Sequence, residues 1–186
     1  MLIAREKYRN NIVEYILYMY HMEDLIRANH FDMDELEKNV LSLYTLPPQQ
    51  WIELKTWYQS MIDQMMKDEI KEIGHLASLK ELIFKLNDLH IQLLNTLGEE
   101  RYLEHYQWAS GMIKELKEKM KSPDLTEIEV CINGLYGFML LKMKNKSISE
   151  ETSQAMAVFS QLLRYISKKY NENNERSISS DQKNLP

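Results

Sequence analysis

The sequence predicts an all-α protein, an antiparallel bundle of six to seven helices around a buried N-terminal helix. The 186 residues include only five glycines and four prolines, which leaves few turns. No stretch alternates apolar and polar residues as a half-buried strand does. Residues 10–27 supply the centre of the bundle, because they are apolar nearly all round a helix and such a helix is wrapped by others or lies in a membrane.

The first predicted helix spans residues 3–29. On a helical projection its apolar side chains cover almost the whole circumference, and Asn10, Glu14 and His21 share a narrow polar arc. The segment carries too many charges for a transmembrane span. We therefore expect this helix to be buried by the rest of the protein.

Boundary signals predict the next two helices. Asp32 is placed to cap a short helix over residues 33–44, because its carboxylate can accept hydrogen bonds from the free amides of the first turn. Pro47 and Pro48 break this helix and can open a third one, which is expected to run to residue 73. Gly74 is expected to end or bend that third helix.

Four further helices are predicted over residues 75–97, 99–121, 125–144 and 147–170. Gly98 is placed to stop the first of them and Asp124 to cap the third. Ser147 and Glu150 form a capping box at the start of the last.

The chain is expected to form a single helical-bundle domain over residues 1–170. Residues 171–186 have almost no apolar content, so we expect a disordered C-terminal tail there.

Composition indicates a cytoplasmic protein. The formal net charge of −5 provides no basic surplus for binding phosphates, so no nucleic-acid partner is expected. Cys131 is the only cysteine, which excludes an intrachain disulfide and fits a reducing compartment. The longest apolar run outside the first helix, residues 130–141, is interrupted by Asn133 and is shorter than the roughly 20 residues of a membrane span. No membrane association is expected.

Four stretches carry a resemblance to a known family: NNIVEYILYMYHMEDLIRA at residues 10–28, GHL at 74–76, DLHIQLL at 88–94 and EIEVCINGLYGFMLLK at 127–142. Over its length to residue 170, the chain resembles an uncharacterised all-helical family of gut anaerobic bacteria, catalogued as a domain of unknown function. The resemblance implies an all-helical bacterial protein of the cytosol. It implies no activity, cofactor or site.

One candidate polar site stands out, formed by Glu23, Asp24, Arg27 and His90. Glu23 falls within the apolar arc of the first helix, where a carboxylate needs a partner. Arg27 lies one turn further on and can grip that carboxylate through two hydrogen bonds. His90 lies on the apolar face of the helix predicted over residues 75–97.

We expect neither a metal nor a cofactor. Glu72 and His75 form the only Glu-x-x-His pair, whereas a di-iron bundle needs two such pairs. A metal site would have to gather histidines from different helices: His21, His30, His75, His90 and His105. Cys131 lies between apolar neighbours in the middle of a helix, where it is expected to serve as a small core residue.

Two functions remain open at this stage. The first is a non-enzymatic helical bundle that acts by binding a protein partner or as a homo-oligomer, because no set of catalytic residues converges. The alternative is a small-ligand-binding or hydrolytic bundle whose pocket gathers Glu23, Asp24, Arg27 and His90. The sequence does not decide whether the protein is an enzyme, and it identifies no small-molecule ligand. A filled interior with an apolar surface patch would favour the first function, and a concave polar pocket the second.

Overall fold

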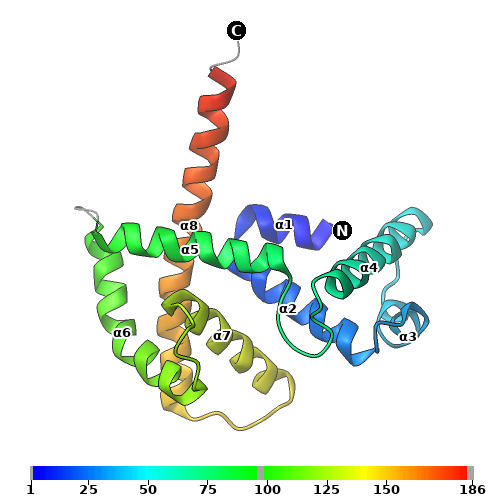
Figure 1. The fold of residues 1–186 in the computed structure, drawn as a ribbon, viewed down its shortest axis with the longest axis horizontal. Helices are drawn as coiled ribbons and strands as arrows, with labels where there is room; N and C mark the ends of the chain where they lie inside the picture. Colours follow the sequence, from blue (N-terminus) through cyan, green and yellow to red (C-terminus); the bar gives the residue numbers. More distant parts are fainter. Residues whose placement is uncertain (1, 96–98, 184–186) are drawn as a thin grey trace. The chain divides into compact units, whose positions relative to one another are not determined.

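The computed structural model describes the backbone of residues 2–95 and 99–183, and the side chains of residues 3–95 and 99–175. This part of the chain contains eight α-helices, one short 3-10 helix and no strand (Figure 1). The predicted all-α class is therefore confirmed. Gly98, expected to stop a helix, lies outside the described residues.

The predicted first helix is divided at Asn11 into α1 (Leu2–Asn10) and α2 (Ile12–Ala28). The Asn11 Oδ1 atom accepts a hydrogen bond from the Val13 amide at 3.1 Å, and the Ile12 amide donates to Ser167 Oγ at 3.1 Å. Both acceptors satisfy amides that a new helix start leaves free. Because of this division the described helices number eight instead of the six to seven predicted.

Two compact units can be distinguished, and the first comprises residues 1–8 and 14–81. It holds most of α1 and of α2, together with α3 (Met33–Asn39), the 3-10 helix η1 (Leu41–Leu43), α4 (Pro48–Lys67) and the start of α5 (Ala77–Asn95). Asp32 caps α3 as predicted, since its Oδ1 atom accepts from the amides of Asp34 at 2.8 Å and Glu35 at 3.0 Å.

Helix α4 ends at Lys67, six residues before the predicted end at residue 73. Glu69 takes a left-handed conformation with φ 57°. The Glu69 and Ile70 amides then bond back to the carbonyls of Met66 and Met65, at 3.2 and 3.1 Å, in the pattern of a Schellman motif. Gly74 (φ 100°) consequently lies in the loop before α5 and does not terminate the helix.

The second unit comprises residues 9–13 and 82–186, and within it α6 (Glu100–Met120), α7 (Glu127–Met143) and α8 (Glu150–Lys183) pack on one another (Figure 1). Thr126 caps α7 in place of Asp124, accepting from the Glu129 amide at 3.2 Å. Ser149 replaces Ser147 as the cap of α8, accepting from the Thr152 amide at 3.1 Å. Both segments offer several residues able to cap, so the sequence left the choice open.

Helix α8 continues to Lys183, through most of the segment for which the sequence predicts a disordered tail. The Asn171 side-chain amide donates to the carbonyls of Arg9 and Asn10 at 3.1 and 3.0 Å, which ties the chain just beyond residue 170 to the N-terminal segment. Helical backbone hydrogen bonds need no apolar side chain, so low apolar content alone did not exclude a helix here. The single domain over residues 1–170 stays a prediction.

Candidate functional site

Glu23 is fully buried, as its position in the apolar arc of α2 predicts. Its Oε2 atom lies 2.6 Å from His75 Nδ1, and its Oε1 atom accepts from the Leu76 amide at 2.9 Å. The His75 ring in turn stacks on Tyr20, with centroids 3.3 Å apart and an angle of 7° between the planes. Both oxygens of the buried carboxylate are therefore satisfied by the loop that precedes α5.

The predicted pairing of Glu23 with Arg27 is wrong. The Arg27 guanidinium bonds to Asp24 Oδ1 at 2.9 Å, to the Ile70 carbonyl at 3.3 Å from two nitrogens, and to the Gly74 carbonyl. The physical reason is the early end of α4 at Lys67, after which the loop brings the carbonyls of Ile70 and Gly74 within reach of Arg27. Arg27 has donors enough for these carbonyls and for Asp24 together.

The contacts of Glu23 fix the start of α5. This helix has no acidic residue in its own first turn. Two carboxylates from elsewhere in the unit accept hydrogen bonds from the amides at its start. Glu23 accepts from the amide of Leu76, just before the helix, and Asp68 Oδ2 accepts from the Ala77 amide at 2.9 Å. Carboxylates at this end of a helix also meet the positive end of its dipole. The Glu23 and Arg27 contacts therefore hold the loop over residues 68–76 against α2.

His90 lies in the second unit and is also buried. Its Nδ1 atom is 2.5 Å from the Tyr102 hydroxyl, and its Nε2 atom is 3.0 Å from Glu127 Oε2. The Tyr106 hydroxyl donates to the other Glu127 oxygen at 3.2 Å. Tyr102, His90 and Glu127 thus form a continuous hydrogen-bonded chain that links α5, α6 and α7.

Electrostatics set the charge states of Glu127 and Tyr102 in this hydrogen-bonded series at neutral pH. The hydrogen bond from His90 lowers the pKa of Glu127 below its ordinary 4.5, against the raising effect of burial, so its carboxylate is ionised. Burial raises the pKa of Tyr102 well above 10, so its hydroxyl keeps its proton.

A hydroxyl, an imidazole and a carboxylate in this order resemble the arrangement that activates a nucleophile. Here the Tyr102 hydroxyl is completely buried, so it has no access to a substrate. Cys131 is buried as well, and burial raises the pKa of its thiol far above the ordinary value. The arrangement therefore suits the joining of three helices better than catalysis.

The four residues of the predicted polar site divide between the two units. Glu23, Asp24 and Arg27 lie in the first unit and His90 lies in the second. The partners of Glu23, His75 and Leu76, belong to its own unit, and so do Tyr102 and Glu127, the partners of His90. A ligand-binding role for these four residues stays a prediction.

The histidines named as possible metal ligands have separate surroundings. His21 is half-buried, and burial lowers its pKa. His30 is exposed and bonds Glu35 at 2.8 Å, and that hydrogen bond raises its pKa. His105 lies near the Tyr165 ring, with centroids 6.0 Å apart. Within the described residues, no group of three or more His, Cys, Asp or Glu side chains could hold a metal ion.

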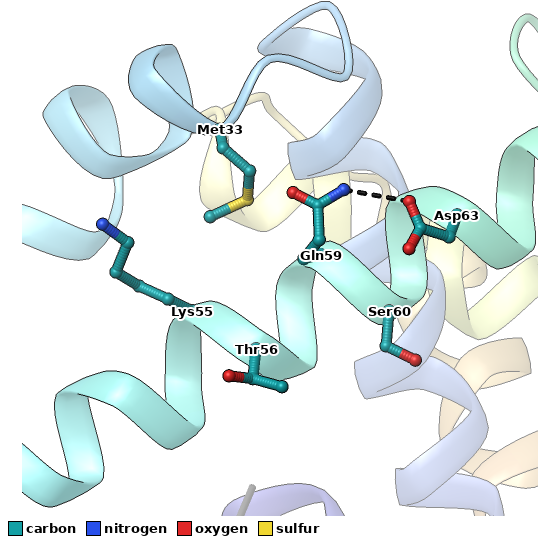
Figure 2. Close-up of a pocket in the computed structure, with 6 residues that line it drawn as sticks. All are labelled: Met33, Lys55, Thr56, Gln59, Ser60 and Asp63. Carbon is teal, nitrogen blue, oxygen red and sulfur yellow. Dashed lines mark hydrogen bonds between the residues drawn. The ribbon is translucent and has the colours of Figure 1, made fainter.

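An open hollow of about 480 Å³ lies between α3 and α4. Figure 2 shows Met33 reaching from α3 toward α4, whose residues Lys55, Thr56, Gln59, Ser60 and Asp63 form the rest of the lining. Several of the polar groups already have partners. The Gln59 amide donates to Asp63 at 2.9 Å, and Lys55 pairs with Glu37 at 2.6 Å. The hollow is thus a wide surface feature in which several of the polar side chains already bond to other side chains of the protein.

Helix α7 is the most apolar segment of the second unit, and it is incompletely covered. In its N-terminal half Val130, Cys131 and Ile132 are buried, while Glu127 and Glu129 are partly exposed. Every residue from 133 to 140 is only partly buried, and residues 141–143 are exposed. This part includes Leu135, Tyr136, Phe138, Met139, Leu140 and Leu141. The apolar side chains in this half of α7 are thus only partly covered by the part of the chain that the structure describes.

The two glycines of α7 show which side is open. A Cβ atom on Gly134 would lie 2.8 Å from Leu116 Cδ2 and 3.5 Å from the methyl carbon of Met156, so this side faces α6 and α8. A Cβ atom on Gly137 would meet nothing within 4 Å. The backbone of α7 is therefore open to close approach at Gly137.

Comparison with known proteins decides the family. The family described as a domain of unknown function (DUF4924) matches residues 1–177. The chain belongs to this family. Its match covers both units and extends past residue 170, the predicted end of the domain. No curated protein and no solved structure gave a significant match. Among the described residues, no helix has both the length and the apolar character to cross a membrane.

Sequence reasoning missed His75 and Glu127 as network residues and the open side of α7. The sequence indicates His75 only as a possible metal ligand, beside Glu72 or with the other histidines, although a buried Glu23 required a partner from another segment. Glu127 stands in the first turn of α7, where a carboxylate is ordinary, so nothing in the sequence distinguished it. The open side of α7 had one available signal, a glycine in the interior of a strongly apolar helix.

Proposed function

We propose that the protein is a non-enzymatic helical protein that acts by association, either with a protein partner or with itself. The observation that supports this function is the partly uncovered apolar side of α7 over residues 133–143. Burying a Leu or Phe side chain contributes about 1.5 to 3 kcal/mol, so several half-exposed ones on a single helix favour a partner. The binding surface is the side of α7 that carries Gly137 and Leu140.

The polar networks support the same function indirectly. Glu23 and His90 direct their polar atoms to groups of their own unit, and these hydrogen bonds hold helices and a loop in place. Of the two networks, the His90 chain involves α7 itself, since Glu127 in the first turn of α7 is one end of it.

A photo-crosslinking experiment tests the proposal. A benzophenone amino acid is placed at Leu140 on the open side of α7 in the full chain, in cells that express it. The matched control carries the same group at Lys119, whose side chain is 71% exposed on α6. We expect discrete crosslinked protein adducts from position 140 and none of these from position 119. Adducts no stronger at position 140 than at position 119 would contradict the proposed function.

We also propose that the protein is cytoplasmic. Its only cysteine, Cys131, is buried as a free thiol, which suits a reducing compartment. Fractionation of cells that express the full chain should recover it with cytosolic markers. Recovery with the membrane or secreted fraction would contradict this location.

A further inference from the structure

One side of α7 carries six residues that lie within an arc of roughly 100° on a helical projection: Glu129, Asn133, Tyr136, Gly137, Leu140 and Lys144. The last of them caps the helix. None of the six is buried. The acidic residue is near the start of the helix and the basic one is at its end, with Asn133, Tyr136, Gly137 and Leu140 between them.

This order is complementary to itself when reversed. If a second α7 lies antiparallel with the two-fold axis between positions 136 and 137, Glu129 of each copy faces Lys144 of the other. In the same alignment Tyr136 faces Gly137, and Asn133 faces Leu140. Two opposite-charge pairs therefore lie on either side of the contacts in which the Tyr136 side chain meets Gly137, which has no side chain. The antiparallel arrangement also sets the dipoles of the two helices in opposite directions.

From this complementarity we infer that the partner of α7 is a second copy of this chain, packed antiparallel along the face defined by Glu129, Asn133, Tyr136, Gly137, Leu140 and Lys144. The inference rests on the proposed function and names its partner. A two-fold interface uses the same patch on both subunits, so the patch must be complementary to itself, as this one is in its charge pairs and in the Tyr136–Gly137 pair.

The space at Gly137 gives the inference its steric basis. A Cβ atom there would meet nothing within 4 Å, so the backbone of α7 is open to close approach at this position. Glycine inside a helix is destabilising relative to alanine, and a facing side chain gives a reason for it. A pair of single helices makes a small interface, so we expect a dimer that dissociates at micromolar concentrations.

Charge reversal tests the alignment by sedimentation velocity over a concentration series of the full chain. Glu129→Lys alone and Lys144→Glu alone each turn both attractive pairs into repulsive ones. We expect each single variant to weaken dimerisation by about tenfold or more. The double variant restores both pairs with opposite polarity and should dimerise as the parent does. The matched control is Lys119→Glu, the same charge change on α6, which should leave dimerisation unchanged. Circular dichroism verifies that each variant is folded.

Three results would overturn the inference: a parent chain that stays monomeric at hundreds of micromolar, single reversals that dimerise as the parent does, or a double variant no better than the single ones. The crosslinks from position 140 separate these failures from failure of the proposed function. Adducts only with a different protein would refute self-pairing and leave the proposed function standing. Absence of adducts above the Lys119 control would refute both.

Discussion

Helices α2 and α7 share a sequence signature and differ in how far they are covered. Both are apolar nearly all round. In α2 only Glu14 and Ala28 are exposed, whereas in α7 every residue from 133 to 140 is only partly buried and residues 141–143 are exposed. The difference teaches that an apolar circumference alone does not tell how far a helix is covered; in our proposal the less covered part of α7 binds a partner. Burial in the structure distinguishes them.

Each of the two helices also carries a glutamate bonded to a histidine, with opposite burial. In the α2 pair the Glu23 side chain is 0% exposed and that of His75 is 28% exposed. In the α7 pair the His90 side chain is 3% exposed and that of Glu127 is 37% exposed. Water can take the place of a removed side chain only where that side chain was exposed. Removing the buried Glu23 carboxylate of α2 should therefore cost far more stability than removing the partly exposed Glu127 carboxylate of α7.

The largest expected effect is that of Glu23→Ala. It leaves the buried Leu76 amide unsatisfied, removes the partner of His75 and opens a cavity, so the free energy of unfolding should fall by about 3 to 5 kcal/mol. Glu127→Ala, the matched variant on α7, should cost only about 1 kcal/mol because water reaches its site. Urea denaturation measures both. Equal losses would show that the burial difference between the two pairs has no energetic consequence.

Replacement of the buried histidine should have the next largest effect. His90→Leu leaves the Tyr102 hydroxyl buried without its partner, so we expect a loss of about 2 kcal/mol. Adding Tyr102→Phe to this variant removes the orphaned hydroxyl and should recover part of the loss. The free energy of unfolding lost on adding Tyr102→Phe to His90→Leu is compared with the loss from Tyr102→Phe alone. Equal losses would show that the two side chains are not coupled.

Acid should act on the α7 pair through Glu127. Its pKa in the folded protein lies below the ordinary 4.5 because His90 donates to it. The folded state thus favours the ionised form, which contributes stability above pH 4.5 that is lost as the pH falls through the lowered pKa. Glu99 acts in the same window, since Lys169 lowers its pKa too. The difference between the parent chain and Glu127→Gln isolates Glu127. The variant should lose less stability than the parent between pH 6 and about 3.5; identical losses would contradict the assignment.

The smallest effect concerns the two glycines of α7. Gly137→Ala faces open space and should stabilise the monomer by about 0.5 to 1 kcal/mol, the usual gain from alanine in a helix interior. In Gly134→Ala the new methyl meets Leu116, which offsets this gain. Urea denaturation at low protein concentration should therefore rank Gly137→Ala above Gly134→Ala. The reverse order would contradict the assignment of the Gly134 side as the covered side of α7.

The sequence predicted most of the helices, because caps, prolines and apolar periodicity are local signals. It predicted the burial of Glu23 from the arc of α2 alone. It failed where a distant residue decided the outcome. Ser167, far along the chain, accepts a hydrogen bond from the Ile12 amide at the start of α2. His75, and not Arg27, is the partner of Glu23. The early end of α4 depends on Glu69 in a left-handed conformation, which a residue other than glycine rarely signals.

The central claim is that the protein acts through the open side of α7, while the buried networks only hold the fold. One paired measurement tests it most directly: melting temperature and sedimentation of Leu140→Glu on α7 beside Glu23→Gln on α2. Leu140→Glu should keep a melting temperature close to that of the monomeric parent chain and lose association. Glu23→Gln should melt at a lower temperature and associate as the parent does when folded. A Leu140→Glu variant that associates normally, or a folded Glu23→Gln variant that does not, would contradict the account.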